Sequence, residues 1–509
     1  MAYIRKVKTT SGATAVQVCE KRGGIRKIVA HIGSARTEVE LAVLMERARE
    51  FLVDPNQMEL DLGTNASSPA SFGGARVIGA VSRLLWEVLE GAYDRVGFDA
   101  VRDEAFKQMV LARVVEPTSK ADVPRVINGL GVSAVSVSTF HRCLKRVVAR
   151  DYQDVVCRAA FNFATEHQVL SLALFDTTTL HFETDKTDEF KAAGRSKEGR
   201  FGPQVQFGLL TDPTGFPLEF VVFPGNKGET RYLIPTLEAL VARHGTRLRD
   251  LIVVADAGIL SAQNCMALDA NGFAFIVGSK TSSARKEILA GLENEAALEV
   301  FVDGQIFERE RLMTGKDLPP TTRRVVYQYK KGRAARDLKV LSEQRDRALK
   351  VIATPSTAKK SRFVRTTGQT PVFNQGLYNQ ATRLAGLKGY VTNITESSVP
   401  GPQIVAWYTN LFQIERSFRM SKNDLHARPF HHHTQDAILA HLVIVFTALA
   451  ISHYLEQTTG ISKKKLVQNL QPLRDATIQI GRATQTIPTH IPKQTQKHLD
   501  KLKNDRALN

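Results

Sequence analysis

Three acidic residues lie in sequence contexts suited to metal-dependent chemistry. Asp176 directly follows the apolar run SLALF, and Asp256 directly follows LIVVA. A charged residue at the carboxyl end of a buried strand lies at the edge of a sheet, where α/β folds place their sites. Glu415 is the one acid between Ser397 and Asn423, in a segment rich in cations. Carboxylates are the ligands that hard divalent ions such as Mg²⁺ prefer, so the three acids together predict a metal site.

Such a site favours phosphodiester chemistry. Two metal ions about 3.5–4 Å apart activate water or a hydroxyl and stabilise the leaving oxygen of a phosphodiester. A structural alternative stays open, because an aspartate after a strand often forms a turn or caps a helix. Spacing alone does not exclude the other acids of this region, which are Glu183, Asp185, Asp188, Glu189, Asp212 and Glu229.

The stretch WYTNLFQIERSFRMSK, from Trp407 to Lys422, predicts one amphipathic helix. Its apolar residues recur every three, four or seven positions and predict a buried stripe of Trp407, Leu411, Ile414, Phe418 and Leu425. The adjacent face carries Tyr408, Glu415, Arg419 and Lys422. On this face the carboxylate would hold a cation while the basic side chains hold DNA phosphates. The simpler alternative is a local salt bridge between Glu415 and Arg419, worth about 0.3–0.5 kcal/mol.

The charge of the whole chain indicates a polyanionic partner. Lysine and arginine number 69 against 51 acidic residues, which gives a net charge of +18 and a pI near 9.7. The four cysteines are scattered without a C-x-x-C pair, which argues against a zinc site or disulfide framework and suits a reducing cytoplasm. The start, MAYIRKVKTT, lacks the apolar core of a signal peptide.

Two further segments invite interpretations that we weigh against simpler ones. The longest apolar stretch, residues 437–451, is too short to span a bilayer and contains a histidine, so it predicts a buried core helix and no membrane association. Three adjacent histidines, residues 431–433, would point different ways on one helix and make a poor single metal site. They favour a helix start with a structural or DNA-facing role.

The first 168 residues divide into two predicted regions. Residues 1–70 alternate in strand fashion and then show helical spacing, which predicts a small N-terminal β/α unit ending in the turn-rich stretch 63–74. Residues 71–168 have the periodicity of buried helices and form a candidate helical DNA-binding domain. Its basic helix with His141, Arg142, Lys145 and Arg146 fits a DNA-reading helix-turn-helix or, equally, a plain bundle with a solvated basic face.

The rest of the chain has the pattern of an interrupted α/β domain with a mixed sheet. Strands alternate with helices over 169–280, and the same texture returns over 400–460 with the Glu415 helix. Between them, residues 281–399 are very basic and strand-like, which predicts a β-rich insertion. The basic tail 461–509 is polar with few aromatic residues, a composition typical of partly disordered segments.

Several of these segments together resemble the DDE transposases of bacterial insertion sequences. In one branch of that family the third acid lies in a Y-x2-R-x3-E-x6-K signature, which Tyr408, Glu415 and Lys422 match, whereas Leu411 replaces the arginine. The segments FDTTTLHFE and VVADAG resemble those bearing the first and second aspartates, which fall on Asp176 and Asp256. The blocks GRSKEGRFGPQVQFG, PGNKGE and RPFHHHTQDAILAHLVIVFTALAI also match, so the likeness extends over about residues 100–460.

The resemblance implies an RNase H-like catalytic core with a mainly β insertion between the second and third acids. It implies Mg²⁺-dependent cleavage at transposon ends, with two ions for which Mn²⁺ would substitute, and then attack of the freed 3′-OH on target DNA. Asp176, Asp256 and Glu415 would be the catalytic metal ligands. Tyr408, Arg416, Arg419 and Lys422 would contact DNA phosphates near the cut.

The partners implied are double-stranded DNA, both transposon ends and target, and a second copy of the chain in a homodimer on DNA. The expected location is the cytoplasm of a bacterium, associated with the nucleoid. Two alternatives stay open: an RNase H-like metal nuclease that cuts without strand transfer, and a catalytically inert DNA-binding protein. The complete set of three acids disfavours the second alternative.

Overall fold

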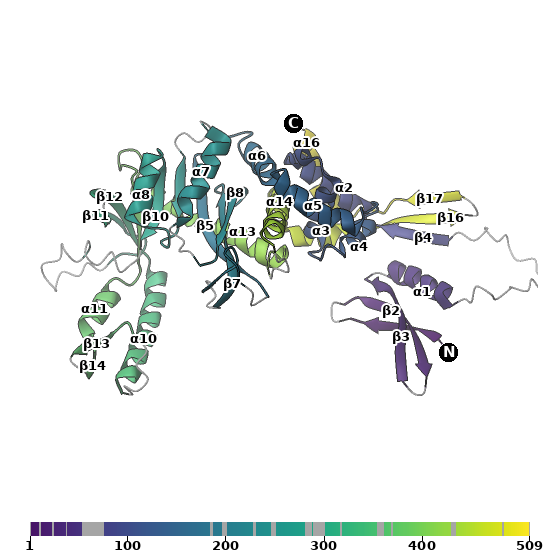
Figure 1. Cartoon of the computed structure of the whole chain (residues 1–509), viewed down its shortest axis with the longest axis horizontal. Coiled ribbons are helices and arrows are strands. Elements are labelled where there is room, and N and C mark those ends of the chain that lie inside the picture. Colours follow the sequence, from purple (N-terminus) through teal and green to yellow (C-terminus); the bar gives the residue numbers. More distant parts are fainter. Residues whose placement is uncertain are drawn as a thin grey trace, which may run out of the picture. The chain divides into compact units, whose positions relative to one another are not determined.

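The computed structural model contains two compact units, which are described separately. The first comprises Met1–Arg95, Asp103–His141 and Tyr454–Asn509, and the second comprises Val96–Arg102 and Arg142–His453 (Figure 1). The structure describes residues 2–9, 12–22, 25–36, 38–52, 76–183, 187–195, 201–226, 231–245, 251–279, 288, 301–315, 318–353, 361–367, 370–428, 434–480 and 483–507. The turn-rich stretch 63–74 and the histidines 431–433 therefore lie outside the described residues, as does part of the predicted insertion.

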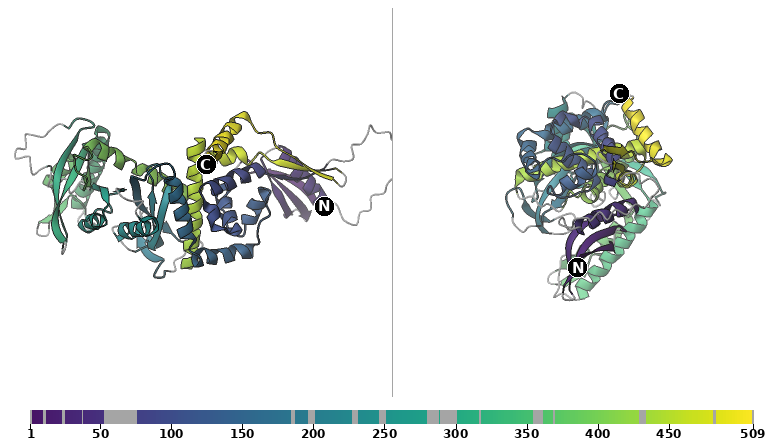
Figure 2. Two further views of the ribbon diagram at one scale, coloured as in Figure 1. Left: turned by 90° about the horizontal axis from the view of Figure 1, so that it is seen from above. Right: turned by 90° about the vertical axis from the view of Figure 1, so that its right-hand side faces the viewer.

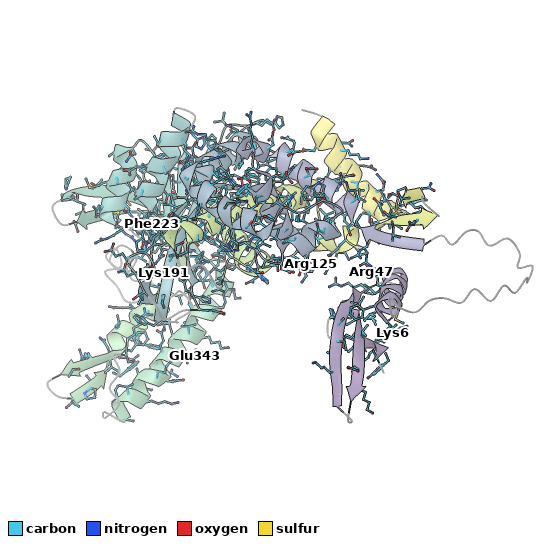
Figure 3. The ribbon with its side chains drawn as sticks, turned by 45° about the vertical axis from the view of Figure 1, so that its right-hand side comes forward. Lys6, Arg47, Arg125, Lys191, Phe223 and Glu343 are labelled. Carbon is cyan, nitrogen blue, oxygen red and sulfur yellow. The ribbon has the colours of Figure 1, made fainter. Side chains whose placement is uncertain are left out.

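An antiparallel sheet of three strands begins the first unit. The strands β1 (Ala2–Lys8), β2 (Thr14–Arg22) and β3 (Ile25–Ala35) are adjacent in chain order, and helix α1 (Glu38–Leu52) covers one face of the sheet (Figure 2). Val16 and Val18 alternate along β2 toward Ala48 of the helix, as the period of a strand requires. Lys6 and Arg47 are exposed cations of this unit (Figure 3). The predicted N-terminal β unit is confirmed.

Helices follow over the region predicted to be helical. The first unit contains α2 (Arg83–Arg95), α3 (Glu104–Val115) and α4 (Val123–Gly129), and α5 (Val137–Ala149) begins in it. Asp103 caps α3 by accepting hydrogen bonds from the backbone N–H groups of Ala105 and Phe106. On α5, His141, Arg142 and Lys145 are exposed and Arg146 is half-buried, so the predicted basic face is present.

The described residues of the C-terminal tail, 461–480 and 483–507, form regular helices and strands for the most part, in contrast to the partial disorder that composition predicted. It forms α15 (Lys463–Leu470), the antiparallel pair β16 (Asp475–Ile480) and β17 (Ala483–Ile487), and α16 (Lys493–Ala507). Strand β16 also pairs with β4 (Arg76–Val81). Helix α16 packs on α2, where Arg95 and Asp505 form an ion pair of 3.1 Å. The tail therefore packs on earlier elements of the first unit, with β16 on β4 and α15 and α16 on α2, and does not form a separate core.

Within the described residues, nine strands form the main sheet of the second unit. Its first part contains β5 (Leu172–His181), β6 (Ala192–Arg195), β7 (Phe201–Thr211), β8 (Pro217–Pro224), β9 (Ile252–Ala255) and β10 (Ala274–Ser279). Strand β7 lies antiparallel between β5 and β8, whereas β5, β9 and β10 are mutually parallel neighbours. The spatial order β8-β7-β5-β9-β10 is consistent with an RNase H-like core and confirms the predicted α/β class with a mixed sheet.

Three later strands extend the same sheet. Strand β15 (Leu387–Thr392) pairs antiparallel with β10, β12 (Leu318–Tyr329) pairs with β15, and β11 (Ile306–Gly315) forms the edge. Between β12 and β15 lie α10 (Lys331–Ala353), the hairpin β13 (Val364–Thr367) and β14 (Thr370–Phe373), and α11 (Gln375–Arg383). Figure 1 shows these four elements grouped together, around a small core of Leu341, Ala348, Phe363 and Ala385.

The described part of the predicted insertion over 281–399 contains both strands and helices. Its longest described element is the helix α10, and its strands β11, β12 and β15 belong to the main sheet instead of a separate one. The basic residues of KKGRAARDLKVL, expected in strands, lie in this helix because the segment is rich in good helix formers, alanine, leucine, arginine and lysine.

Helices enclose this sheet, and one of them is almost wholly apolar. They are α6 (Tyr152–Ala164), α7 (Leu233–His244), α8 (Ala262–Ala270), the short η1 (Phe98–Val101) and α14 (Gln435–Thr459), whose last residues belong to the first unit. By length and composition α14 is long enough to cross a membrane, but 94% of its most apolar 18-residue window is buried inside the protein. The prediction of a buried core helix over 437–451 is confirmed.

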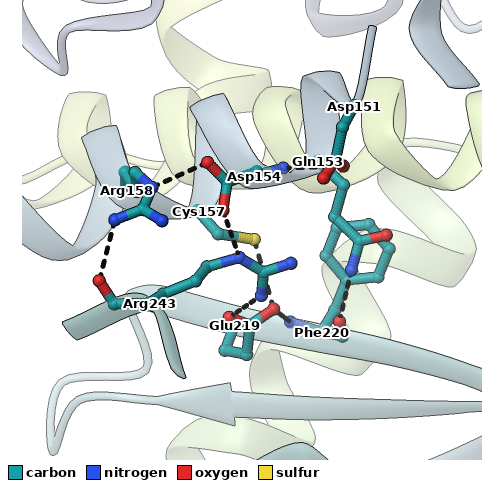
Figure 4. A network of polar contacts seen from close by, with 8 residues as sticks. All are labelled: Asp151, Gln153, Asp154, Cys157, Arg158, Glu219, Phe220 and Arg243. Carbon is teal, nitrogen blue, oxygen red and sulfur yellow. Dashed lines mark hydrogen bonds and ion pairs between the residues drawn. The ribbon is translucent and has the colours of Figure 1, made fainter. Parts of the chain in front are cut away.

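A buried ion pair joins α6, β8 and α7 (Figure 4). Glu219 of β8 is fully buried and accepts hydrogen bonds from Arg243 of α7 and from the thiol of Cys157 on α6. Asp154 of α6 binds the same guanidinium at 3.1 Å. Burial raises the pKa of Glu219, and Arg243 opposes that shift. The network therefore joins β8 to α6 and α7. The buried carboxylate of Glu219 is stabilised in its charged form by Arg243.

Candidate active site

Asp176 and Asp256 are neighbours across the sheet, although Asp176 lies within β5 and not at its end as the sequence predicted. Strands β5 and β9 run parallel with Phe175 opposite Ala255, and each aspartate follows its strand partner by one residue. Asp176 is half-buried within β5, and its Oδ1 accepts a 2.7 Å hydrogen bond from the backbone N–H of Thr177. Asp256 is exposed just beyond the end of β9. The structure thus brings together two carboxylates that are 80 positions apart in the sequence.

The helix carrying Glu415 is interrupted, contrary to the prediction of one helix from Trp407 to Lys422. Helix α12 (Gly401–Thr409) ends before Asn410, α13 (Leu411–Arg419) begins after it, and a π-helical turn, η5 (Met420–Asp424), follows. Asparagine favours helix ends because its side chain competes with the backbone for hydrogen bonds. Asn410 keeps right-handed helical dihedral angles, and buried positions recur every three or four residues on both sides of it.

The buried stripe differs from the predicted one at two adjacent positions. Leu411, Ile414, Phe418 and Leu425 are buried as predicted, but Trp407 is only half-buried. Tyr408 is 4% exposed, so it does not lie on the exposed face with Glu415 and Arg419. No ion pair joins Glu415 to Arg419 in the described part of the chain, which removes the simpler explanation of the Glu415 carboxylate.

Helix α13 is fixed in place by a serine two residues after Glu415. The Ser417 hydroxyl lies 2.8 Å from the carbonyl oxygen of Gly215, in the turn between β7 and β8, and 3.0 Å from Nε2 of His453 on α14. Gly215 has φ of 92° in this turn, and a Cβ there would press on the Gln413 carbonyl and on Ser417. Helix α13 also packs on β5, so Glu415 is held near the strand that carries Asp176.

Tyr408 is the direct neighbour of Asp256. Its phenol donates a 3.0 Å hydrogen bond to Oδ1 of Asp256. Burial raises the pKa of Tyr408, and the charges of Asp256 and, less strongly, Asp176 raise it further, so the phenol remains a donor. The ring lies above Gly278 of β10, where a side chain would collide with the hydroxyl. Sequence reasoning placed Tyr408 on DNA, whereas the structure places it on a carboxylate.

Lys388 is a site residue that the sequence did not reveal. It lies at the start of β15, and its Nζ is 4.3 Å from the centre of the Tyr408 ring and 5.9 Å from that of Tyr390. Burial lowers its pKa and Arg333 lowers it too, whereas the charges of Asp256 and Glu415 raise it. Lys388 therefore lies within electrostatic reach of both acids. A lysine inside the otherwise apolar strand LKGYVT was the available signal.

The donor set fits a hard divalent cation held partly by water and substrate. Asp176, Asp256 and Glu415 supply only oxygen ligands, and Tyr408 occupies one oxygen of Asp256. Among the residues that the structure describes, no three His, Cys, Asp or Glu side chains are grouped closely enough to hold a metal ion by themselves. Mg²⁺ commonly binds through one or two carboxylates together with waters and substrate phosphates, so the adjacent aspartates suffice to begin such a site.

The basic residues predicted to contact DNA phosphates differ in their exposure to solvent. Arg416 and Arg419 are exposed on α13, and Lys422 is half-buried in the π-helical turn. Arg416 is also near enough to His453 to lower the pKa of that buried imidazole.

Of the competing acids, Asp212 is committed to the turn before β8, where its Oδ1 accepts hydrogen bonds from Thr214 and Phe216. Asp185, Glu229 and the family-like residues 196–200 lie outside the described residues.

Comparison with known proteins gives the family. The model of the transposase DDE domain matches residues 167–451, more than half of the chain. The chain belongs to the DDE transposase family. Members typically are metal-dependent enzymes of DNA cleavage and strand transfer, and they generally use divalent ions. All three acids lie within the matched DDE segment.

The remaining comparisons add little. One similar solved structure is that of a piggyBac transposase synaptic complex with hairpin DNA, at 12% identity, with 76% of each chain covered and a TM-score of 0.38. No curated protein matches the chain.

Proposed function

We propose that the protein is the transposase of an insertion sequence, which cuts DNA at the ends of the element and joins them to target DNA. The observation that carries the proposal is the adjacency of Asp176, within β5, and Asp256, just beyond β9, inside the DDE segment and beside the helix of Glu415. The net charge of +18 supports a DNA partner, with salt-dependent binding to the phosphate backbone.

In this proposal the three acids bind the metal, and neighbouring side chains hold two of them in position. Asp176, Asp256 and Glu415 hold Mg²⁺, with two ions in the complete site and Mn²⁺ as a substitute. When bound, the metal supplies activation of the attacking oxygen and charge stabilisation of the leaving oxygen. Tyr408 orients Asp256 through its hydrogen bond. Ser417 holds α13 against the β7–β8 turn and so positions Glu415.

The basic residues would hold the substrate. Arg416, Arg419 and Lys422 follow Glu415 along the chain, and we assign them to DNA phosphates near the cut. Tyr408 is better assigned to Asp256 than to a phosphate, because its hydroxyl is already committed. The helical region over 71–168, with its basic face on α5, would bind the terminal repeats, and a homodimer on DNA would hold both ends.

Isosteric variants of the acids test this function. Asp176→Asn and Glu415→Gln remove the negative charge with little change in shape. We expect both to bind duplexes carrying the ends of the element in a mobility-shift assay and to lose Mg²⁺-dependent nicking on a denaturing gel. Asp346→Asn, an exposed carboxylate of α10, is the matched control.

The products separate the alternatives. Joined target DNA would support transposition, whereas cutting without joining would identify a metal nuclease. An inert DNA-binding protein would give neither product. Nicking that survives both acid substitutions would show that these residues are not the catalytic ligands.

A further inference from the structure

The start of β15 lies at the same edge of the sheet as the ends of the parallel strands. In the register, Phe175 is opposite Ala255, Ala255 is opposite Val277, and Ser279 is opposite Gly389. Because β15 runs antiparallel to β10, its first residues lie at the side of the sheet where β9 and β10 finish and where the pairing of β5 with β9 stops. Lys388 is therefore placed by the sheet itself at the edge that carries Asp176 and Asp256, although the insertion separates it from them in sequence.

Aromatic rings fix the lysine side chain at this edge. Lys388 and Tyr390 are two residues apart on β15 and so share a face of the sheet. The Tyr390 ring lies 4.6 Å from the Tyr408 ring, and the Lys388 Nζ lies over Tyr408 at 4.3 Å. A cation over an aromatic face is attracted by the ring, and more strongly when partly removed from water. The ammonium is thus held beside a phenol whose hydroxyl donates to Asp256.

Two acids and one arginine set the charge around it. Lys388 interacts electrostatically with Asp256 from the sheet edge and with Glu415 from α13, while Arg333 of α10 repels it. These are two of the acids assigned above to metal binding. An ammonium near two carboxylates supplies part of the positive charge that a divalent ion would otherwise bring to them.

We propose that Lys388 is a built-in counter-cation of the acidic site, whose charge lowers the affinity of Asp256 and Glu415 for a divalent ion. The inference rests on the proposed function, because it assumes that these acids bind metal. The unbranched side chain of lysine is long and flexible, so its ammonium can swing away while its stem keeps packing on Tyr408. Metal affinity is consequently lower than the carboxylates alone would give.

Binding of Mn²⁺ to the full-length, DNA-free protein tests this directly. Titration followed by the electron paramagnetic resonance of free Mn²⁺ gives the dissociation constant without any need for activity. We expect Lys388→Met to tighten binding on the order of tenfold, because it removes a positive charge close to the ion. Lys388→Arg keeps the charge and should bind as the wild type does. Lys339→Met removes an exposed charge from α10 and is the matched control.

Stability gives a second readout that guards against misfolding. Saturating Mn²⁺ should raise the melting temperature of Lys388→Met by more than that of the wild type at the same concentration, since tighter binding to the folded state stabilises it further. Equal or weaker Mn²⁺ binding by Lys388→Met would overturn the counter-cation role. If Mn²⁺ binding by the wild type survives Asp176→Ala and Asp256→Ala, the metal site of the proposed function is itself misplaced. Failure of the proposed function would thus appear as Mn²⁺ binding that survives the aspartate substitutions. Failure of the counter-cation role alone would appear as a Lys388→Met protein that binds Mn²⁺ no more tightly than the wild type.

Discussion

The phenol of Tyr408 donates its hydrogen bond to Asp256, 152 positions earlier in the chain, at 3.0 Å. The bond joins helix α12 to the end of β9 and leaves the second carboxylate oxygen of Asp256 available to a metal ion. Residues that orient a metal ligand in this way affect affinity and activity nearly as strongly as the ligands do. The tyrosine of the family-like signature thus acts here on the second acid.

Removing only the hydroxyl measures this contribution. We expect Tyr408→Phe to lower single-turnover nicking about 10- to 100-fold, because Asp256 loses the donor that orients it. The free energy of unfolding should fall by only about 1 kcal/mol, the net value of one hydrogen bond. Tyr390→Phe, in the neighbouring ring, is the control and should nick normally. Equal rates in both variants would rule out a positioning role for Tyr408.

The absence of a side chain at residue 278 keeps the hydroxyl in place. A Cβ added to Gly278 would collide with the Tyr408 hydroxyl and lie 3.1 Å from the Ala257 backbone nitrogen. We expect Gly278→Ala to destabilise the protein by about 1–3 kcal/mol through overpacking and to reduce nicking. Gly202→Ala, where a Cβ meets nothing within 4 Å, is the control in the same sheet.

A double variant separates collision from general damage. Tyr408→Phe removes the atom that a Cβ at Gly278 would strike first. The unfolding free energies from urea titration should therefore be non-additive, with Gly278→Ala costing less in the Tyr408→Phe background than alone. Strict additivity would mean that the alanine disturbs the backbone of Ala257 instead.

The contact between Ser417 and His453 predicts a dependence of stability on pH. Burial, and secondarily the charge of Arg416, lowers the pKa of His453 from 6.5 to about 3. Between pH 6.5 and about pH 3, His453 is protonated in the unfolded chain but neutral in the folded protein. The contribution of His453 to the free energy of unfolding is therefore fully present above pH 6.5 and is lost as the pH falls below it. The loss between pH 7 and pH 5 amounts to about 2 kcal/mol for this group. Urea titrations at both pH values should show it in the wild type and show a smaller loss in His453→Gln. An unchanged loss in that variant would assign the effect to other groups.

The buried pair of Glu219 and Arg243 predicts an asymmetry between two arginines. Arg243→Ala leaves a carboxylate with 0% exposure without its guanidinium, which should cost about 3–5 kcal/mol. Arg158→Ala removes an exposed partner of Asp154 in the same network and should cost no more than about 1 kcal/mol. Thermal unfolding of both variants measures the difference. Similar losses would show that the buried carboxylate takes up a proton at little cost.

The acids could be singled out from local patterns, and their role as metal ligands stays a prediction. Asp256 follows a run of buried residues, whereas Asp176 interrupts a run that continues to Leu180. The predicted stripe of Leu411, Ile414 and Phe418 correctly gave the buried face of α13. Long apolar runs bounded by polar residues are strong signals, and they gave the strands of the core. The burial of α14 followed in the same way from its composition.

The position of Lys388 and the ordered tail depend on contacts between distant segments. The position of Lys388 follows from the register of β15 with β10, which no local pattern encodes. Residues 493–507 are polar overall, yet Leu499 and Leu502 are buried at helical spacing. The average composition of the tail does not reveal this spacing. The two leucines are buried in the first unit, where α16 packs on α2, a helix about 400 positions earlier in the sequence.

The packing of α13 on β5 also orders events during protein synthesis. The two elements meet across more than 230 positions, so a growing chain carries both aspartates long before it carries Glu415. Contacts between segments this far apart form late, because the ends of a long loop must first come together. A nascent or prematurely terminated chain that stops before residue 411 lacks α13 and with it Glu415. If the proposed function holds, a chain acquires its third acid only after about four fifths of its residues have been synthesised.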